Sequence, residues 1–154
     1  MDFRITGLSP EPFRHLFGLP DHELAKHRAI RVIADDVNYP DRIGMREVAI
    51  GDSLLLLNHV CQPVESPYYA THAIYVHEHA TEVYDRINEV PAVMRSRLLS
   101  LRAYNEKGMI IGAEVVQGTE VEGAIERLFS NENAAYIHAH NAARGCYSGR
   151  IDRA

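Results

Sequence analysis

The sequence has 154 residues, of which 46% are hydrophobic and 24% charged, and its formal net charge is -5. This composition is typical of a globular protein and excludes the low hydrophobicity and high net charge of a disordered chain. The length predicts one domain over residues 1–154. The negative charge argues against a nucleic-acid partner, because proteins that bind nucleic acids normally carry a clustered basic surface.

The sequence predicts neither a targeting signal nor a membrane span. No segment approaches the roughly 20 apolar residues of a membrane-spanning helix, and the N-terminal residues lack the apolar stretch of a signal peptide. We therefore expect a cytoplasmic protein with no membrane partner. In that reducing compartment Cys61 and Cys146 are not expected to form a structural disulfide.

The first part of the chain predicts two strands and two short helices. Residues 3–6 are typical of a short strand, and a helix is expected to begin at Ser9 as its N-cap and to end at Gly18. Asp21 is expected to cap a second helix. The β-branched residues of 29–34 then predict a strand.

The middle of the chain predicts two strands and a long loop. Residues 53–58 form a continuous apolar run, which favours a strand buried on both faces in the centre of a sheet. The window 61–69 is a proline-containing loop rich in groups that can hydrogen-bond a ligand, and Gln62 is its candidate ligand contact. The structural alternative is that its prolines and tyrosines fix a long connection against the domain. Residues 72–79 alternate, which predicts a strand with one polar face.

Residues 98–116 predict a β-hairpin around a glycine-containing loop at 105–108. Arg102 and Glu114 are expected to share one face of it and to form a cross-strand ion pair. The functional alternative is that Arg102 lines a cavity beside His138.

One helix and one further strand follow. Thr119 and Glu122 form a candidate capping box before an amphipathic helix, and residues 134–140 alternate as in a strand. Because strands outnumber helices and several are linked as hairpins, the sequence predicts an α+β fold. We expect a mostly antiparallel mixed sheet with two or three short helices.

The leading candidate site is the run 136–147, YIHAHNAARGCY, which concentrates polar, nucleophilic and cationic groups. Strand periodicity places His138 and His140 on one face. Gly145 is expected at a positive φ, which would bring Cys146 round beside the charge of a neighbouring arginine that favours a thiolate.

The first functional hypothesis is a small-molecule site, enzymatic or not, for an anionic ligand. Cys146 would be the nucleophile, and His138 or His140 the base. The residues expected to contact the substrate are Asn141, Arg144, Tyr147, Gln62 and Arg102. The structural alternative is a buried, inert cysteine with hydrogen-bonded surface histidines. The sequence contains no common nucleotide-binding glycine loop and identifies no cofactor.

Two other hypotheses stay open. His77 and His79 repeat the spacing of His138 and His140, so two such strands side by side would present four imidazoles to a zinc ion. The other hypothesis is a non-catalytic interaction module whose partner is a protein or a second copy of the chain, as in a homodimer.

Four segments carry a resemblance to a known family: FRITGL at 3–8, LLLN at 55–58 before Gln62, RLLSLR at 97–102 and HAHNAARGCY at 138–147. With these segments the chain resembles a bacterial family of short single-domain proteins, the domain-of-unknown-function family numbered twelve hundred and three. The resemblance implies a shared fold but no activity, cofactor or catalytic residue. It favours the histidines and the cysteine of the last segment over His72, His77 and His79, which lie outside these segments.

Overall fold

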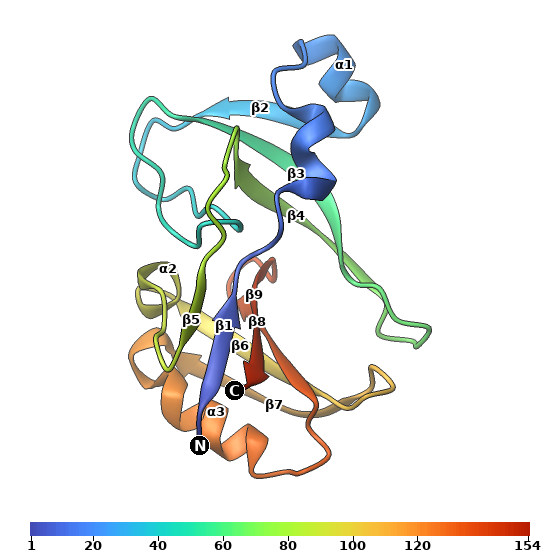
Figure 1. The fold of residues 1–154 in the computed structure, drawn as a ribbon, viewed down its shortest axis with the longest axis vertical. Helices are drawn as coiled ribbons and strands as arrows, with labels where there is room; N and C mark the ends of the chain where they lie inside the picture. Colours follow the sequence, from blue (N-terminus) through green and yellow to red (C-terminus); the bar gives the residue numbers. More distant parts are fainter.

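The computed structural model describes residues 1–154 and consists of two antiparallel sheets with short helices on their outer sides (Figure 1). One sheet has six strands and the other three. The helices comprise three α-helices and two 3-10 helices. The predicted α+β class with mostly antiparallel strands is confirmed, and the strands are divided between two sheets.

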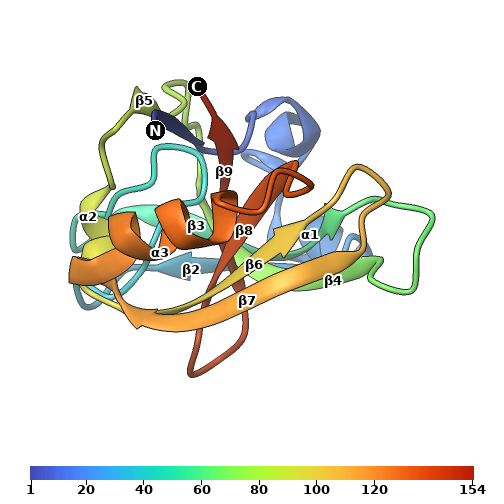
Figure 2. The same ribbon diagram turned by 90° about the horizontal axis from the view of Figure 1, so that it is seen from below.

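The six-stranded sheet has the order β5-β1-β9-β8-β6-β7, and every neighbouring pair is antiparallel. Its strands are β1 (Phe3–Thr6), β5 (Asp85–Ile87), β6 (Leu98–Tyr104), β7 (Ile110–Gln117), β8 (Tyr136–Asn141) and β9 (Tyr147–Arg153). The short helix α2 is Ala92–Arg95, and α3 is Val121–Phe129. Figure 2 shows α3 lying across the face of this sheet that is turned away from the second sheet.

The main hydrophobic core lies between α3 and this face. Ile137 and Ala139 of β8 pack there with Ile125 and Leu128 of α3. This confirms the predicted alternation along β8, because His138 and His140 point to the opposite face.

The second sheet has the order β2-β3-β4, with β2 Ala29–Ile33, β3 Ser53–Gln62 and β4 Ala70–His77. The 3-10 helix η1 (Glu11–Leu16) and α1 (Asp21–Lys26) precede it, and residues of both share a second buried cluster with β3 and β4. The central position of β3 is as predicted. Its residues Leu54 and Leu55 point to opposite faces, and both are completely buried.

The predicted helix caps were wrong. α3 follows the 3-10 helix η2 (Gly118–Glu120) without a side-chain cap, and Glu122 instead forms an ion pair with Arg95 of α2. Asp21 is the first residue of α1, and the first helix is a 3-10 helix capped by Pro10, not by Ser9. In each case the backbone enters the helix from an adjoining turn or proline.

The sequence did not predict β5, α2 or β9. The residues of β9, YSGRIDR, carry little apolar periodicity, and the strand is instead held by ladders to β8 and β1. β4 ends at His77, and His79 lies beyond the strand with a positive φ of 68°. None of the helices is long and apolar enough to span a bilayer.

Candidate functional site

The polar face of the six-stranded sheet is turned toward the second sheet. Tyr136, His138 and His140 lie on this face of β8, and the two imidazole centroids are 6.3 Å apart. Both imidazoles are almost wholly buried, with 2% and 1% of their surface exposed. His138 lies opposite Arg102 of β6 and Arg150 of β9. The two histidines therefore share one side of the strand, as the periodicity predicts.

Contacts across this face join the two sheets. Gln62, at the end of β3, donates from Nε2 to the Tyr136 hydroxyl at 2.8 Å. The ring of His72 on β4 lies 4.9 Å from the ring of His140, edge to face. Tyr147 belongs to the buried cluster of the second sheet while its ring packs on His138 at 5.2 Å. We call this layer of polar side chains between the sheets the seam. Its residues are Gln62, His72, Arg102, Tyr136, His138, His140, Tyr147 and Arg150.

The turn between β8 and β9 positions the side chains of both His140 and Cys146. Gly145 has a φ of 77°, which confirms the predicted left-handed conformation. Its carbonyl oxygen lies 3.0 Å from Nδ1 of His140. Because a carbonyl only accepts, Nδ1 carries the proton and Nε2 keeps a lone pair, which is buried without a partner.

The sulfur of Cys146 has two hydrogen-bond donors. Nη2 of Arg42 lies 3.4 Å from Sγ, and Nδ2 of Asn141 lies 3.3 Å from it. Neither imidazole of β8 hydrogen-bonds to the sulfur. Cys61 is also a free thiol, but it lies in the second buried cluster, where burial raises the pKa of its thiol to about 11.

Arg42 is the functional candidate that the sequence did not reveal. Its side chain is 3% exposed, and it donates from Nε to the carbonyl of Tyr147 at 2.6 Å and from Nη1 to that of Pro40 at 2.7 Å. It makes no ion pair. Burial lowers the pKa of this guanidinium, but a guanidinium keeps its charge in proteins. No motif in the surrounding loop could have singled it out.

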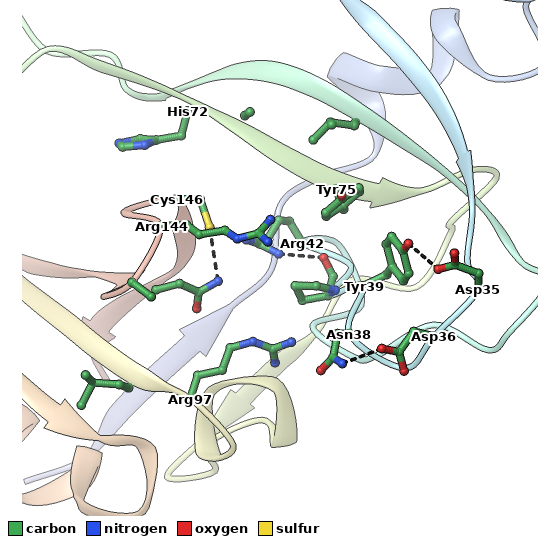
Figure 3. Close-up of a pocket in the computed structure, with 16 residues that line it drawn as sticks. Asp35, Asp36, Asn38, Tyr39, Arg42, His72, Tyr75, Arg97, Arg144 and Cys146 are labelled. Carbon is green, nitrogen blue, oxygen red and sulfur yellow. Dashed lines mark hydrogen bonds between the residues drawn. The ribbon is translucent and has the colours of Figure 1, made fainter.

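A cavity of about 720 Å³ opens beside Cys146 between the two sheets (Figure 3). Arg42, Arg144 and Asn141 line it next to the sulfur, and His72 lines its wall on β4. Arg144 is exposed on the β8–β9 turn and makes no ion pair. Arg97 also lines the cavity, but it already pairs with Glu47 at 2.5 Å. The cavity thus presents two unpaired cations and a thiol.

Several of the residues expected to contact the substrate lie outside this lining. Gln62, Tyr147 and Arg102 belong to the seam. The predicted ion pair between Arg102 and Glu114 was wrong, because a bulge in the hairpin sets Leu101 opposite Glu114. Glu114 pairs instead with Arg127 of α3, while Arg102 donates to Ser100 and has no carboxylate partner.

The predicted four-imidazole zinc site was wrong. β4 pairs only with β3, whereas β8 lies between β6 and β9 in the other sheet. His77 instead contacts Asp52 at 3.1 Å. Across residues 1–154, no group of three or more His, Cys, Asp or Glu side chains is arranged to hold a metal ion.

A family model described as a protein of unknown function (DUF1203) matches residues 38–153, about three quarters of the chain. The chain belongs to this family. The DUF1203 region contains Arg42, Arg144 and Cys146, so the cationic end of the cavity lies inside it. Neither the search of curated proteins nor the search of solved structures found a match.

The buried imidazoles predict a loss of stability in acid. Burial is the main cause that lowers the pKa of His138 to about 3 and that of His140 to about 4. An unfolded histidine titrates near 6.5, so below that pH the unfolded state binds more protons and the free energy of unfolding falls. The loss should begin near pH 6.5 and continue toward pH 4, at up to roughly 1.4 kcal/mol per pH unit for each histidine.

Urea unfolding between pH 4.5 and 7.5 measures this slope. The variant His138→Gln is expected to show a shallower slope, because one of the two groups is gone. The control is His22→Gln on the surface, which should keep the wild-type slope. An unchanged slope in His138→Gln would contradict the assignment.

Proposed function

We propose that the chain binds a small anionic molecule in the cavity between its two sheets, with Cys146 as the thiol that meets the ligand. The observation that carries this proposal is Arg42, a buried guanidinium that reaches the cavity and makes no ion pair. A buried charge is costly unless it is paired. An anion at this position therefore gains more from Arg42 than it would from an arginine on the surface.

Arg144 supports the same end of the cavity from the β8–β9 turn. Its side chain is exposed, whereas Arg42 is buried and held in place by two carbonyl oxygens. Guanidinium groups bind carboxylate and phosphate oxygens through paired N–H donors. One buried and one exposed guanidinium suit the binding of such a group.

The surroundings of Cys146 support a nucleophilic role for its sulfur. Arg42 and Asn141 both direct N–H donors at Sγ, so the sulfur accepts two hydrogen bonds. Reactive cysteines lie in partly exposed surroundings with a positive charge nearby, and Cys146 is partly exposed beside Arg42. The sulfur would then lie beside the anionic group of the ligand.

Anion binding is tested with inorganic phosphate, sulfate and short carboxylates, followed by NMR titration of the amide signals of the whole chain. Wild-type protein is expected to bind at least one of them, and Arg144→Gln to weaken that binding about tenfold, equivalent to the roughly 1.4 kcal/mol of one charged hydrogen bond. Arg86→Gln is the matched control, because Arg86 is exposed on β5 outside the cavity. If no anion shifts signals around the cavity, the proposal is wrong.

The thiol is tested by comparing iodoacetate with iodoacetamide, which differ in charge. In both reactions the sulfur attacks the methylene carbon and iodide leaves. Because the site attracts anions, the rate ratio of iodoacetate to iodoacetamide should be higher at Cys146 than for free glutathione, and lower in Arg144→Gln. Buried Cys61 should stay unmodified in the native state and serves as an internal control. Equal ratios in wild type and variant would count against the proposal.

Self-association is a second candidate function, favoured by the edge strand β7. Its outer edge is unpaired along Ile110–Gln117, and Val115 is 63% exposed. The strand contains neither proline nor lysine, the residues that commonly protect an edge from pairing. An antiparallel strand is complementary to its own copy, so β7 suits a two-fold dimer.

Sedimentation velocity over a range of concentrations tests this dimer. Wild-type protein should dimerise, and Val115→Lys should be monomeric because the lysine charge meets its own copy across the edge. Ile30→Lys, at an exposed position of β2, is the control and should still dimerise. A wild-type protein that stays monomeric up to high concentration would rule this candidate out.

A further inference from the structure

The cavity has a second end that carries the opposite charge. Asp35 and Asp36 line it there, and both are exposed. Asp35 accepts a hydrogen bond from the Tyr39 hydroxyl at 2.6 Å. Asp36 accepts from the backbone N–H of Val37 at 2.6 Å and from Asn38 at 3.0 Å, and the Val37 bond is the main cause that lowers the pKa of Asp36. Asp36 is therefore ionised at neutral pH.

The opposite charges of the cavity do not pair with each other. Neither Asp35 nor Asp36 makes an ion pair, and neither does Arg42 or Arg144. Figure 3 shows the two carboxylates at one end of the cavity, well away from Cys146 and Arg144. Two unpaired anions and two unpaired cations thus line one cavity from separate ends.

Two tyrosines lie between the two ends (Figure 3), and apolar side chains also line the cavity. The rings of Tyr39 and Tyr75 meet edge to face, with centroids 5.3 Å apart, and the apolar lining includes Leu56 and Ala73. Aromatic rings attract ammonium groups, and apolar side chains suit a hydrocarbon chain. An ammonium beside Tyr39 would also meet the carboxylate of Asp35, which that tyrosine positions.

We infer that the ligand is zwitterionic, with its anionic group at Arg42 and Arg144 and an ammonium group at Asp35 and Asp36. This inference rests on the anion binding proposed above and adds the chemical class of the ligand. A cavity of about 720 Å³ lies within the usual range for small-molecule sites, about 300–1,000 Å³. The ligand is therefore an ω-amino acid or a short peptide whose charged ends lie apart.

Matched pairs of ligands test the ammonium end separately. The probes are 4-aminobutanoate, 6-aminohexanoate and 8-aminooctanoate, each compared with the plain carboxylate of the same length by NMR titration. At the best-fitting length the amino acid should bind about tenfold more tightly than its carboxylate. The amide signals around Asp36 should shift only with the amino acids.

The double variant Asp35→Asn/Asp36→Asn should reduce this preference to less than about twofold while leaving carboxylate binding undiminished. The control Glu106→Gln/Glu132→Gln removes the same charge from exposed residues outside the cavity and should retain the preference. Circular dichroism and thermal melting establish that each variant is folded.

The possible failures are distinguishable. If carboxylates and amino acids bind equally well at every length, or if the double variant keeps the preference, the zwitterion inference is wrong while anion binding stands. If neither the carboxylates nor phosphate and sulfate bind, the proposed function itself is wrong.

Discussion

Arg42 holds a positive charge between the two sheets, where only 3% of its surface is exposed. The guanidinium keeps its proton, so its charge must be stabilised by hydrogen bonds, and the carbonyl oxygens of Pro40 and Tyr147 accept two of them. These bonds tie the loop before β3 to the start of β9. They also fix the remaining N–H donors toward Cys146 and the cavity. The same contact therefore joins the sheets and builds the cationic end of the site.

The neutral histidines of the seam explain why the positive charge is concentrated at Arg42. His138 and His140 lie near Arg102, Arg150 and Arg42, and burial together with these positive neighbours keeps both imidazoles neutral. A protonated histidine in this layer would add a further cation, and Asp152, which lies opposite Tyr136, already pairs with Arg150. The seam is thus polar but carries little extra charge, and an incoming anion is attracted to the cavity end, not to the imidazoles.

Local periodicity was sufficient to predict the β6–β7 hairpin, the alternation of β8 and the left-handed Gly145, because each depends on neighbours in the sequence. The resemblance to the DUF1203 family, carried by four short segments, was also confirmed. By contrast, β9 depends on pairing with the N-terminal strand β1, and Arg42 acquires its role only from Tyr147, which lies 105 positions away. Such distant contacts leave no periodic signal, so the sequence singled out Cys146 as a candidate but not Arg42, which hydrogen-bonds to its sulfur.

The two ends of the cavity contribute unequally to the binding free energy of a ligand. Leaving exposed carboxylates such as Asp35 and Asp36 without a cation costs little, because a surface ion pair contributes only about 0–1 kcal/mol. Leaving Arg42 without an anion costs more, since it is buried and its hydrogen bonds to carbonyl oxygens do not neutralise its charge. The anionic group should therefore supply most of the affinity, and the ammonium end should decide which anions bind. Arg42 lies within the DUF1203 region, whereas Asp35 and Asp36 precede it.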